Sequence, residues 1–220
     1  MSQYNIIAES QEYTVVSEYE KTASSSDAYQ SEADLEREFI HLLGEQGYEY
    51  LPIHTEADLI SNLRTQLEKL NNYHFTDNEW ETFFNTCIAN KNDDIVAKTA
   101  KIQEDYIQVL KRDTGESQNI YLIDKKNIHN NSVQVINQYE EKEGNHDTRY
   151  DVSILVNGLP LVHVELKRRG VQLKEAFNQI NRYQRDSFWA GCGLYEYVQI
   201  FVISNGTNTK YYSNTTRANH

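Results

Sequence analysis

The sequence predicts an α/β fold, with helices packed on a mixed β-sheet and a helical part at the N-terminal end. Three observations predict this class. Apolar residues recur at helical spacing in segments of the first half, short β-rich runs follow from about residue 104, and one more helical pattern precedes the last run. This order of elements indicates an α+β fold or an α/β/α sandwich around a mixed sheet.

Length and composition agree with one folded unit of good size. The 220 residues are 39% hydrophobic and include only two prolines, which is enough for a real core. We expect a single domain over residues 1–220, divided into a mainly helical part, 1–103, and a β-rich part, 104–220.

The helical part opens with an extended segment over residues 1–20. Ser31 and Asp34 then form a capping-box signal for a first helix that ends at Gly44 or Gly47. The apolar stripe of this helix is Leu35, Phe39, Leu42 and Leu43.

Further helices follow along the chain. Leucines at helical spacing mark a second helix over about 56–72, and Thr76 is placed to cap a third over 77–89. The polar stretch 89–101 is predicted to be a loop or a short helix.

The β-rich part alternates strand patterns with turn signals. The predicted strands are 105–110, 119–124, 132–140, 150–156, 159–166 and 197–204. A helical pattern over 172–188 precedes the last strand, and Asn205-Gly206 ends that strand.

Charge and cysteine content exclude several classes of protein. The formal net charge of −12 argues against autonomous, tight binding to DNA, although not against chemistry on DNA that another module delivers. No apolar run reaches the roughly 18–20 residues that cross a bilayer, and the N-terminus lacks a secretory signal pattern. Cys87 and Cys192 are best interpreted as a reduced intracellular pair.

The dipeptide Asn157-Gly158 is a strong hairpin signal between two apolar runs. A three-residue loop that starts at Asn157 would set Asp151 opposite Glu165, with β-carbons about 5 Å apart. A two-residue loop would instead set Asp151 against Val164, which points the other way. The two carboxylates therefore predict the longer loop.

Glu165 and Lys167 are two residues apart, so they share one face of their strand with His163, while the alternate residues point into a core. Two opposed carboxylates repel unless a cation neutralises them. Mg²⁺ prefers oxygen ligands and is commonly held by one or two carboxylates. Asp151 and Glu165 are thus candidate ligands, together with the Leu166 carbonyl. Lys167 is the candidate for orienting water and stabilising charge during phosphodiester hydrolysis.

The alternative interpretation is a surface ion pair on a hairpin. Two features favour a site: the apolar flanks indicate a buried sheet, where unpaired carboxylates are costly, and the next helix carries Gln179 and Tyr183 one turn apart. Gln179 would contact DNA or the lysine while Tyr183 positions it, or Tyr183 simply packs in the core. Local positive charge comes from Arg168, Arg169, Lys174 and Arg182.

Asp151, Glu165-x-Lys167 and Gln179-x-x-x-Tyr183 together resemble the PD-(D/E)xK nucleases that carry a QxxxY element. More closely, the chain is similar to the N-terminal part of the restriction (R) subunit of type I restriction enzymes of the IC type. The similarity runs along nearly the whole chain, through YQSEADLEREFIHLLGEQGYEY, NIYLIDKKN, RYDVSILVNGLPLVHVELKRRG, EAFNQINRY and YVQIFVISNGT. It implies the α/β/α sandwich of that nuclease fold, with a central mixed sheet and an added N-terminal helical part.

The resemblance also implies an activity. It implies a Mg²⁺-dependent endonuclease that cuts double-stranded DNA after ATP-driven translocation, in a cytoplasmic bacterial complex with methylation (M) and specificity (S) subunits and without a membrane partner. Metal binding falls to Asp151 and Glu165, and catalysis to these two and Lys167. Supporting or DNA-binding roles fall to Gln179, Tyr183, Arg168, Arg169 and Arg182.

The chain departs from the family pattern in two respects. Tyr150 stands where the motif has its proline, which matters little because that proline only shapes the start of the strand. No GxxxxGK[ST] phosphate loop occurs, so ATP would bind only to motor domains outside this chain. We therefore expect the N-terminal fragment of a longer subunit, with weak or no cleavage in isolation.

Several residues and functions stay open. An acidic residue of the first helix, Glu36 or Glu38, is a candidate for the site, although a solvated helix face explains either one. His163 is a candidate support for Glu165 and not a catalytic group. The competing function is a non-catalytic module that couples the subunit to its partners and regulates the motor. A third hypothesis is a degenerate nuclease scaffold, in which Asp151 and Glu165 would lie apart or be blocked from solvent.

Overall fold

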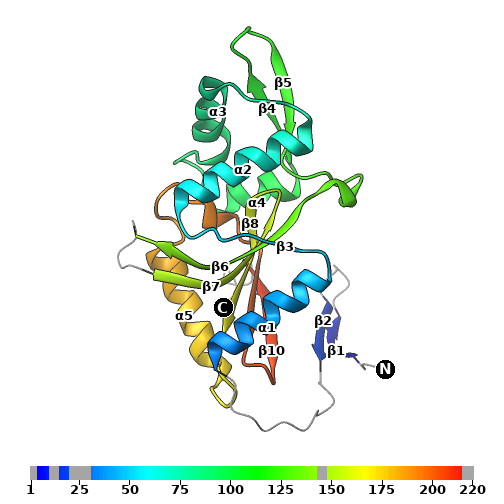
Figure 1. Cartoon of the computed structure of the whole chain (residues 1–220), viewed down its shortest axis with the longest axis vertical. Helices are drawn as coiled ribbons and strands as arrows, with labels where there is room; N and C mark the ends of the chain where they lie inside the picture. Colours follow the sequence, from blue (N-terminus) through cyan, green and yellow to red (C-terminus); the bar gives the residue numbers. More distant parts are fainter. Residues whose placement is uncertain (1–3, 10–14, 20–30, 143–147, 215–220) are drawn as a thin grey trace.

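The computed structural model describes residues 4–9, 15–19, 31–142 and 148–214 (Figure 1). Its helices are α1 (Glu32–Glu45), α2 (Glu56–Asn71), α3 (Asp77–Phe83), the π-helical η1 (Phe84–Ile88), α4 (Ile95–Gln103), the 3₁₀ turns η2 (Ile128–Asn130) and η3 (Leu194–Tyr197), and α5 (Leu173–Asp186). Its strands are β1 (Tyr4–Glu9), β2 (Val15–Tyr19), β3 (Glu49–Tyr50), β4 (Ile107–Lys111), β5 (Ser117–Tyr121), β6 (Val133–Glu141), β7 (Thr148–Val156), β8 (Leu159–Leu166), β9 (Ile200–Ser204) and β10 (Thr209–Ser213).

Six of the described strands form the main sheet, in the order β10-β9-β8-β7-β6-β3. The β8–β9 and β3–β6 pairs are parallel and the others antiparallel, so the predicted mixed sheet is confirmed. Helix α5 makes the crossover that a parallel β8–β9 pair needs. Strand β10 has no counterpart among the predicted strands.

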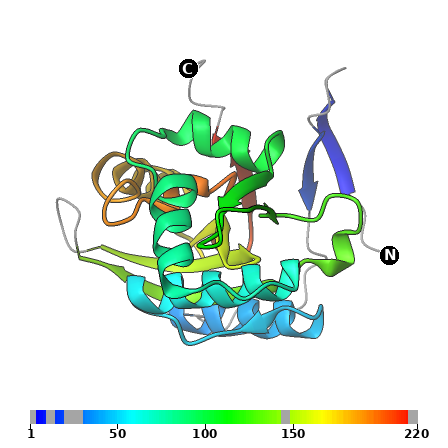
Figure 2. The same cartoon turned by 90° about the horizontal axis from the view of Figure 1, so that it is seen from above.

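Helices α1 and α5 cover opposite faces of the sheet. Side chains alternate along β8 and β9, so Val164 and Leu166 pack with Leu43 of α1, whereas Phe201 and Ile203 belong to the core that includes α5. Figure 1 shows α1 in front of the strands, and Figure 2 shows it running along one side of the sheet. The central strands are therefore covered on both sides.

The helix starts follow the predicted caps. The Ser31 side chain accepts a hydrogen bond from the Asp34 backbone N–H, and the Asp34 carboxylate accepts one from the Ser31 backbone, which confirms the capping box of α1. Thr76 and Glu79 form the same arrangement at the start of α3. These caps fix where the chain turns from extended to helical.

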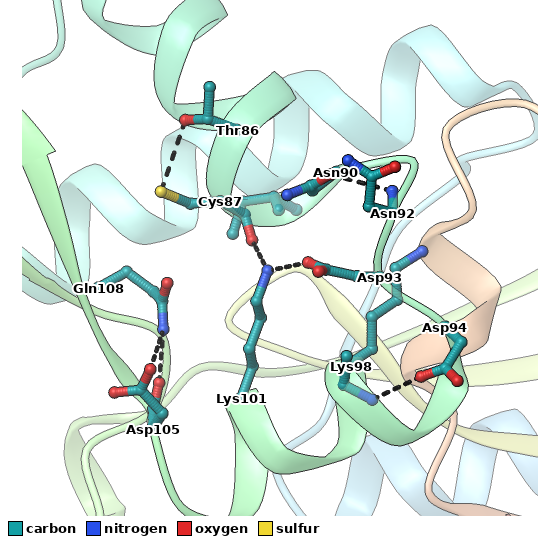
Figure 3. Close-up of polar contacts among 12 residues, drawn as sticks. Thr86, Cys87, Asn90, Asn92, Asp93, Asp94, Lys98, Lys101, Asp105 and Gln108 are labelled. Carbon is teal, nitrogen blue, oxygen red and sulfur yellow. Dashed lines mark hydrogen bonds and ion pairs between the residues drawn. The ribbon is translucent and has the colours of Figure 1, made fainter.

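A helical lobe, made of α2, α3, η1, α4 and the β4–β5 hairpin, stands at one end of the sheet (Figure 1). Its hydrophobic core includes the fully buried leucines of α2, and the polar stretch predicted as loop or short helix supplies α4. Lys101 of α4 extends to the Cys87 carbonyl and the Asp93 carboxylate (Figure 3). The β4–β5 hairpin packs in this lobe and pairs with no strand of the main sheet.

The β1–β2 hairpin confirms the extended segment predicted at the N-terminal end, and β2 lies against β10. Within the described ranges, no helix is long and apolar enough to cross a membrane.

Candidate functional site

The turn between β7 and β8 is shorter than predicted. It contains only Asn157 and Gly158, with φ of 51° and 83°, as a two-residue hairpin turn requires. The three-residue loop was therefore a wrong prediction. Leu161 has no partner in β7, so it forms a bulge that shifts the pairing by one residue. Beyond the bulge Val152 pairs with Val164, which is the register that the three-residue loop would have given.

Asp151 lies where β7 and β8 separate. The strand pairing runs to Val152 and Val164, and beyond it the Asp151 carboxylate accepts a hydrogen bond from the Leu166 backbone N–H at 2.9 Å. Burial, followed by the negative charge of Glu165, raises the pKa of Asp151 to about 7, and Glu36 adds to the effect. Without a cation, this carboxyl group therefore holds its proton more tightly than an ordinary aspartate does.

Glu165 and Lys167 form a tight pair. Glu165 is 0% exposed, and its Oε1 accepts a hydrogen bond from Lys167 Nζ at 2.8 Å. Lys167 Nζ also donates to the Leu166 carbonyl at 3.1 Å. Burial alone would lower the pKa of Lys167, but the charge and hydrogen bond of Glu165 and the charge of Asp151 raise it. Lys167 is therefore a cation that is bonded to Glu165 and also affected by the charge of Asp151.

His163 is fully buried on the same face of β8 as Glu165. Its ring makes edge contacts with Tyr150, Tyr183 and Phe188, and its Nε2 lies 3.5 Å from Glu165 Oε2. Neither ring nitrogen has a hydrogen-bond partner among the described residues. His163 thus lies behind Glu165, away from solvent.

The Gln179–Tyr183 pair connects α5 to β7. The Gln179 amide donates to the Tyr183 hydroxyl, and the hydroxyl donates to the Arg149 carbonyl at 3.1 Å. Burial and the charge of Glu165 raise the pKa of Tyr183. The structure therefore joins the two predicted helix residues to the strand just before Asp151, and not to Lys167.

The predicted arginines are all exposed. Arg168 and Arg169 follow β8 directly, and the Arg168 backbone N–H donates to Glu32 of α1 at 3.3 Å. Arg169 lines a shallow groove between α1 and the sheet together with Glu38. Arg182 lies on α5. In the described structure, none of these three side chains contacts Asp151 or Glu165.

The two acids of the first helix differ. Glu38 is exposed, whereas Glu36 is only 9% exposed and turns toward the sheet. The Glu36 carboxylate accepts hydrogen bonds from the side-chain amides of Asn137 and Gln138 in β6. The sequence analysis did not select these two amides. Their only signal was a polar pair inside an apolar strand.

Comparisons with known proteins show the family of the chain. Residues 29–220 match the family model described as type I restriction enzyme R protein N terminus. The chain belongs to this family. The type I restriction enzyme EcoprrI endonuclease subunit of Escherichia coli is 50% identical over 212 residues, which cover 96% of this chain and 67% of that protein.

More distant relatives share smaller parts. The SauCOLORF180P endonuclease subunit of Staphylococcus aureus (strain COL) is 42% identical over 85% of this chain, and the putative MjaIXP endonuclease subunit of Methanocaldococcus jannaschii is 34% identical over 47%. The chain spans about two thirds of the Escherichia coli relative and 20% of the Staphylococcus relative. These relatives are therefore longer than this chain.

The residues of this family member fit a hard divalent cation of the Mg²⁺ type. Among the described residues, no three His, Cys, Asp or Glu side chains are grouped as a metal site. Two carboxylates are nevertheless a common Mg²⁺ set. Glu165 Oε2 is buried and accepts no hydrogen bond within the described part of the chain. Burial and, after it, the negative charge of Glu165 raise the pKa of Asp151, and a cation between the two carboxylates would offset both effects. Both features suit a cation at Asp151 and Glu165.

Proposed function

We propose that this chain is the endonuclease part of a type I restriction complex and that it hydrolyses phosphodiester bonds of double-stranded DNA with Mg²⁺. The observation that carries the proposal is the convergence of Asp151, Glu165 and Lys167 at the point where β7 and β8 separate. The family membership supports the same class of activity.

The proposed roles follow from the contacts. Asp151 and Glu165 would hold the cation, which when bound supplies Lewis-acid activation of the phosphodiester and of the attacking water. Lys167 has three N–H donors, so it can keep its bonds to Glu165 and the Leu166 carbonyl and still orient a water or a phosphate oxygen. Tyr183 fixes β7 next to Asp151 through the Arg149 carbonyl. Arg168, Arg169 and Arg182 would offset the acidic surface where DNA approaches.

The three site residues differ in their exposure to solvent. Glu165 is fully buried, whereas Asp151 and Lys167 are partly exposed. DNA would therefore meet Asp151 and Lys167 first. The degenerate-scaffold hypothesis requires that Asp151 and Glu165 lie apart or are blocked from solvent. Glu165 is indeed buried. It is bonded, however, to Lys167, whose side chain is partly exposed to solvent.

The remaining parts of the proposal come from the family resemblance. ATP-driven motor domains would lie outside this chain, and methylation and specificity subunits would supply target recognition in a bacterial cytoplasmic complex. The second candidate function, a non-catalytic module that couples the subunit to the motor, uses the same fold. The two are separated by measuring cleavage and translocation together.

The test replaces Lys167→Ala and Glu165→Gln in the complete subunit, assembled with its partners. We expect cleavage to fall by about a hundredfold or more, since an electrostatic stabiliser of the transition state is lost, with translocation and ATP hydrolysis unchanged. Lys69→Ala, at an exposed lysine in the last turn of α2 in the helical lobe, is the matched control and should cleave normally. Full cleavage by both site variants contradicts the proposal and favours the scaffold hypothesis. Loss of translocation in folded variants favours coupling.

A further inference from the structure

Strands β6 and β7 both lose their regular alternation at the level of the site. In β6, Val135 lies in the core under α1 and Ile136 in the opposite core, as alternation requires, but Tyr139 also lies in the opposite core. In β7, Tyr150 and Val152 are two residues apart and yet belong to different cores. The break therefore falls at Gln138 in one strand and at Asp151 in the other.

Gln138 is the cause of the break in β6. Its φ is +53°, a left-handed conformation that few residues other than glycine, asparagine and aspartate adopt. The flanking pairs Asn137–Val152 and Tyr139–Tyr150 keep one register, so Gln138 lies opposite Asp151. Strained backbone of this kind persists only where the surrounding structure holds it, and it is frequent at functional sites.

The strained backbone has a consequence for side chains. Neighbouring residues of a regular strand point to opposite faces. Here the amides of Asn137 and Gln138 both bond to Glu36 of α1, one to each carboxylate oxygen. The Asn137 amide is itself oriented, because its oxygen accepts a hydrogen bond from the Tyr50 hydroxyl at 2.9 Å. Glu36 is thus held from two sides beside Asp151.

We propose that Asn137 and Gln138 are positioning residues, which hold Glu36 as a third negative charge next to Asp151 and Glu165 and so strengthen the binding of a divalent cation. This inference rests on the proposed function. Glu36 acts through its charge, since no group of three acids in the described structure is arranged as direct ligands. Groups that orient a metal site from outside commonly change metal affinity by about 10–100-fold when they are removed.

The test measures Mn²⁺ binding to this chain by calorimetry, together with melting temperature. Gln138→Gly removes the amide and accepts the left-handed backbone; Gln138→Ala removes the amide and keeps the strain. We expect both variants to bind Mn²⁺ about 10–100-fold more weakly than the unmodified chain. The glycine variant should melt about 2–4 °C above the alanine variant. Glu36→Gln, which keeps the shape and removes the charge, should weaken binding as well.

Asn72 supplies the matched control. It ends α2 at φ +47°, in the helical lobe and on no strand of the site. Asn72→Gly and Asn72→Ala should differ in melting temperature as the Gln138 variants do, with unchanged Mn²⁺ affinity.

Two outcomes contradict the inference and are distinguishable from failure of the proposed function. If Mn²⁺ binding depends on Glu165, as shown by its loss in Glu165→Gln, and yet both Gln138 variants bind normally, the amides have only a structural role. If only Gln138→Ala binds Mn²⁺ more weakly, the affinity depends on the left-handed backbone and not on the side-chain amide. If the unmodified chain shows no binding that depends on Glu165, the proposed cation site and the inference both fall.

Discussion

Buried acids occur in the helical lobe and in the site, and the protein treats them differently. In the lobe, Glu79 accepts hydrogen bonds from the Tyr73 hydroxyl and from the backbone N–H groups of Thr76 and Asp113. Although burial opposes it, these bonds lower the pKa of Glu79. In the site, Asp151 accepts one backbone hydrogen bond and its pKa is raised to about 7.

Buried lysines show the same contrast. Lys98 of the lobe is almost fully buried, and its ammonium donates to the Gly193 carbonyl at 2.9 Å and to Glu196 at 2.5 Å. Lys167 of the site is a single cation whose pKa is raised by the charges of more than one acid, Glu165 and Asp151 among them. The difference teaches that the buried charges of the lobe have their hydrogen-bond partners within the fold, whereas Glu165 Oε2 of the site has none among the described residues, as the proposed cation site requires.

The largest expected effect is on stability in the lobe. Lys98→Met should destabilise the fold by about 3 kcal/mol, because it leaves the Gly193 carbonyl and Glu196 without their partner. Lys167→Met should cost less, about 2 kcal/mol. It leaves Glu165 Oε1 without its donor, but Asp151 can take up a proton and so reduce the negative charge beside it. Urea unfolding at neutral pH measures both. Equal losses would erase the contrast between the two regions.

The next effect is a pH dependence set by Asp151. Its pKa is about 7 in the fold and 3.8 as the ordinary value, so the folded state binds the proton more tightly between these values. Stability should therefore fall as pH rises through this window, by roughly 2–3 kcal/mol from this group between pH 5 and pH 8. Asp151→Asn should remove that part of the slope. Urea unfolding at pH 5 and pH 8 without divalent cations checks the sign of this change in the free energy of unfolding. If Asp151→Asn shows the same pH dependence as the unmodified chain, another group causes it.

Glu79 should give the opposite sign. Its pKa is lowered in the fold, so its contribution is present above the ordinary value of 4.5 and is lost as pH falls below it. Glu79→Gln should cost about 1.5 kcal/mol at pH 7, the size of one hydrogen bond to a charged group, and almost nothing at low pH. Acid titration followed by circular dichroism measures the difference. If Glu79→Gln lowers the free energy of unfolding as much at pH 3 as at pH 7, the shape of the Glu79 side chain stabilises the lobe and its charge does not.

The smallest effect concerns the link from α5 to β7. Tyr183→Phe removes the hydroxyl that joins Gln179 to the Arg149 carbonyl, and it should destabilise the fold by about 1 kcal/mol. Cleavage by the complete subunit should fall more than stability does, because β7 is less well fixed near Asp151. Tyr211→Phe on β10 is a distant comparison. Equal effects of the two changes on cleavage would leave Tyr183 a packing residue.

Local signals in the sequence predicted much of this molecule. The capping residues Ser31 and Thr76 fixed the helix starts, and Asn157-Gly158 located the central hairpin. The two-residue spacing at the end of β8 placed Glu165 and Lys167 together, since alternate side chains of a strand lie on the same face. These features depend on neighbours within a few residues, which a single sequence shows.

Features that depend on distant neighbours were missed. The extra residue Leu161 compensates the shorter turn, and no local signal announces it beyond the proline before it. The left-handed conformation of Gln138 is held by contacts to α1, about a hundred residues earlier in the chain. The β4–β5 hairpin looked like part of one β-rich half, yet it packs in the helical lobe because its apolar face matches that core.

Gly158 ties the two regions together. A side chain there would place its β-carbon 2.6 Å from the Leu63 Cα, so the tip of the β7–β8 ribbon rests directly on the backbone of α2. Leu63 is fully buried in the core that continues from the lobe into the sheet. Separating the lobe from the sheet would expose that shared core to water, so we expect the two regions to unfold together. Heating should therefore give a single cooperative transition, seen alike by helix signal and by aromatic fluorescence.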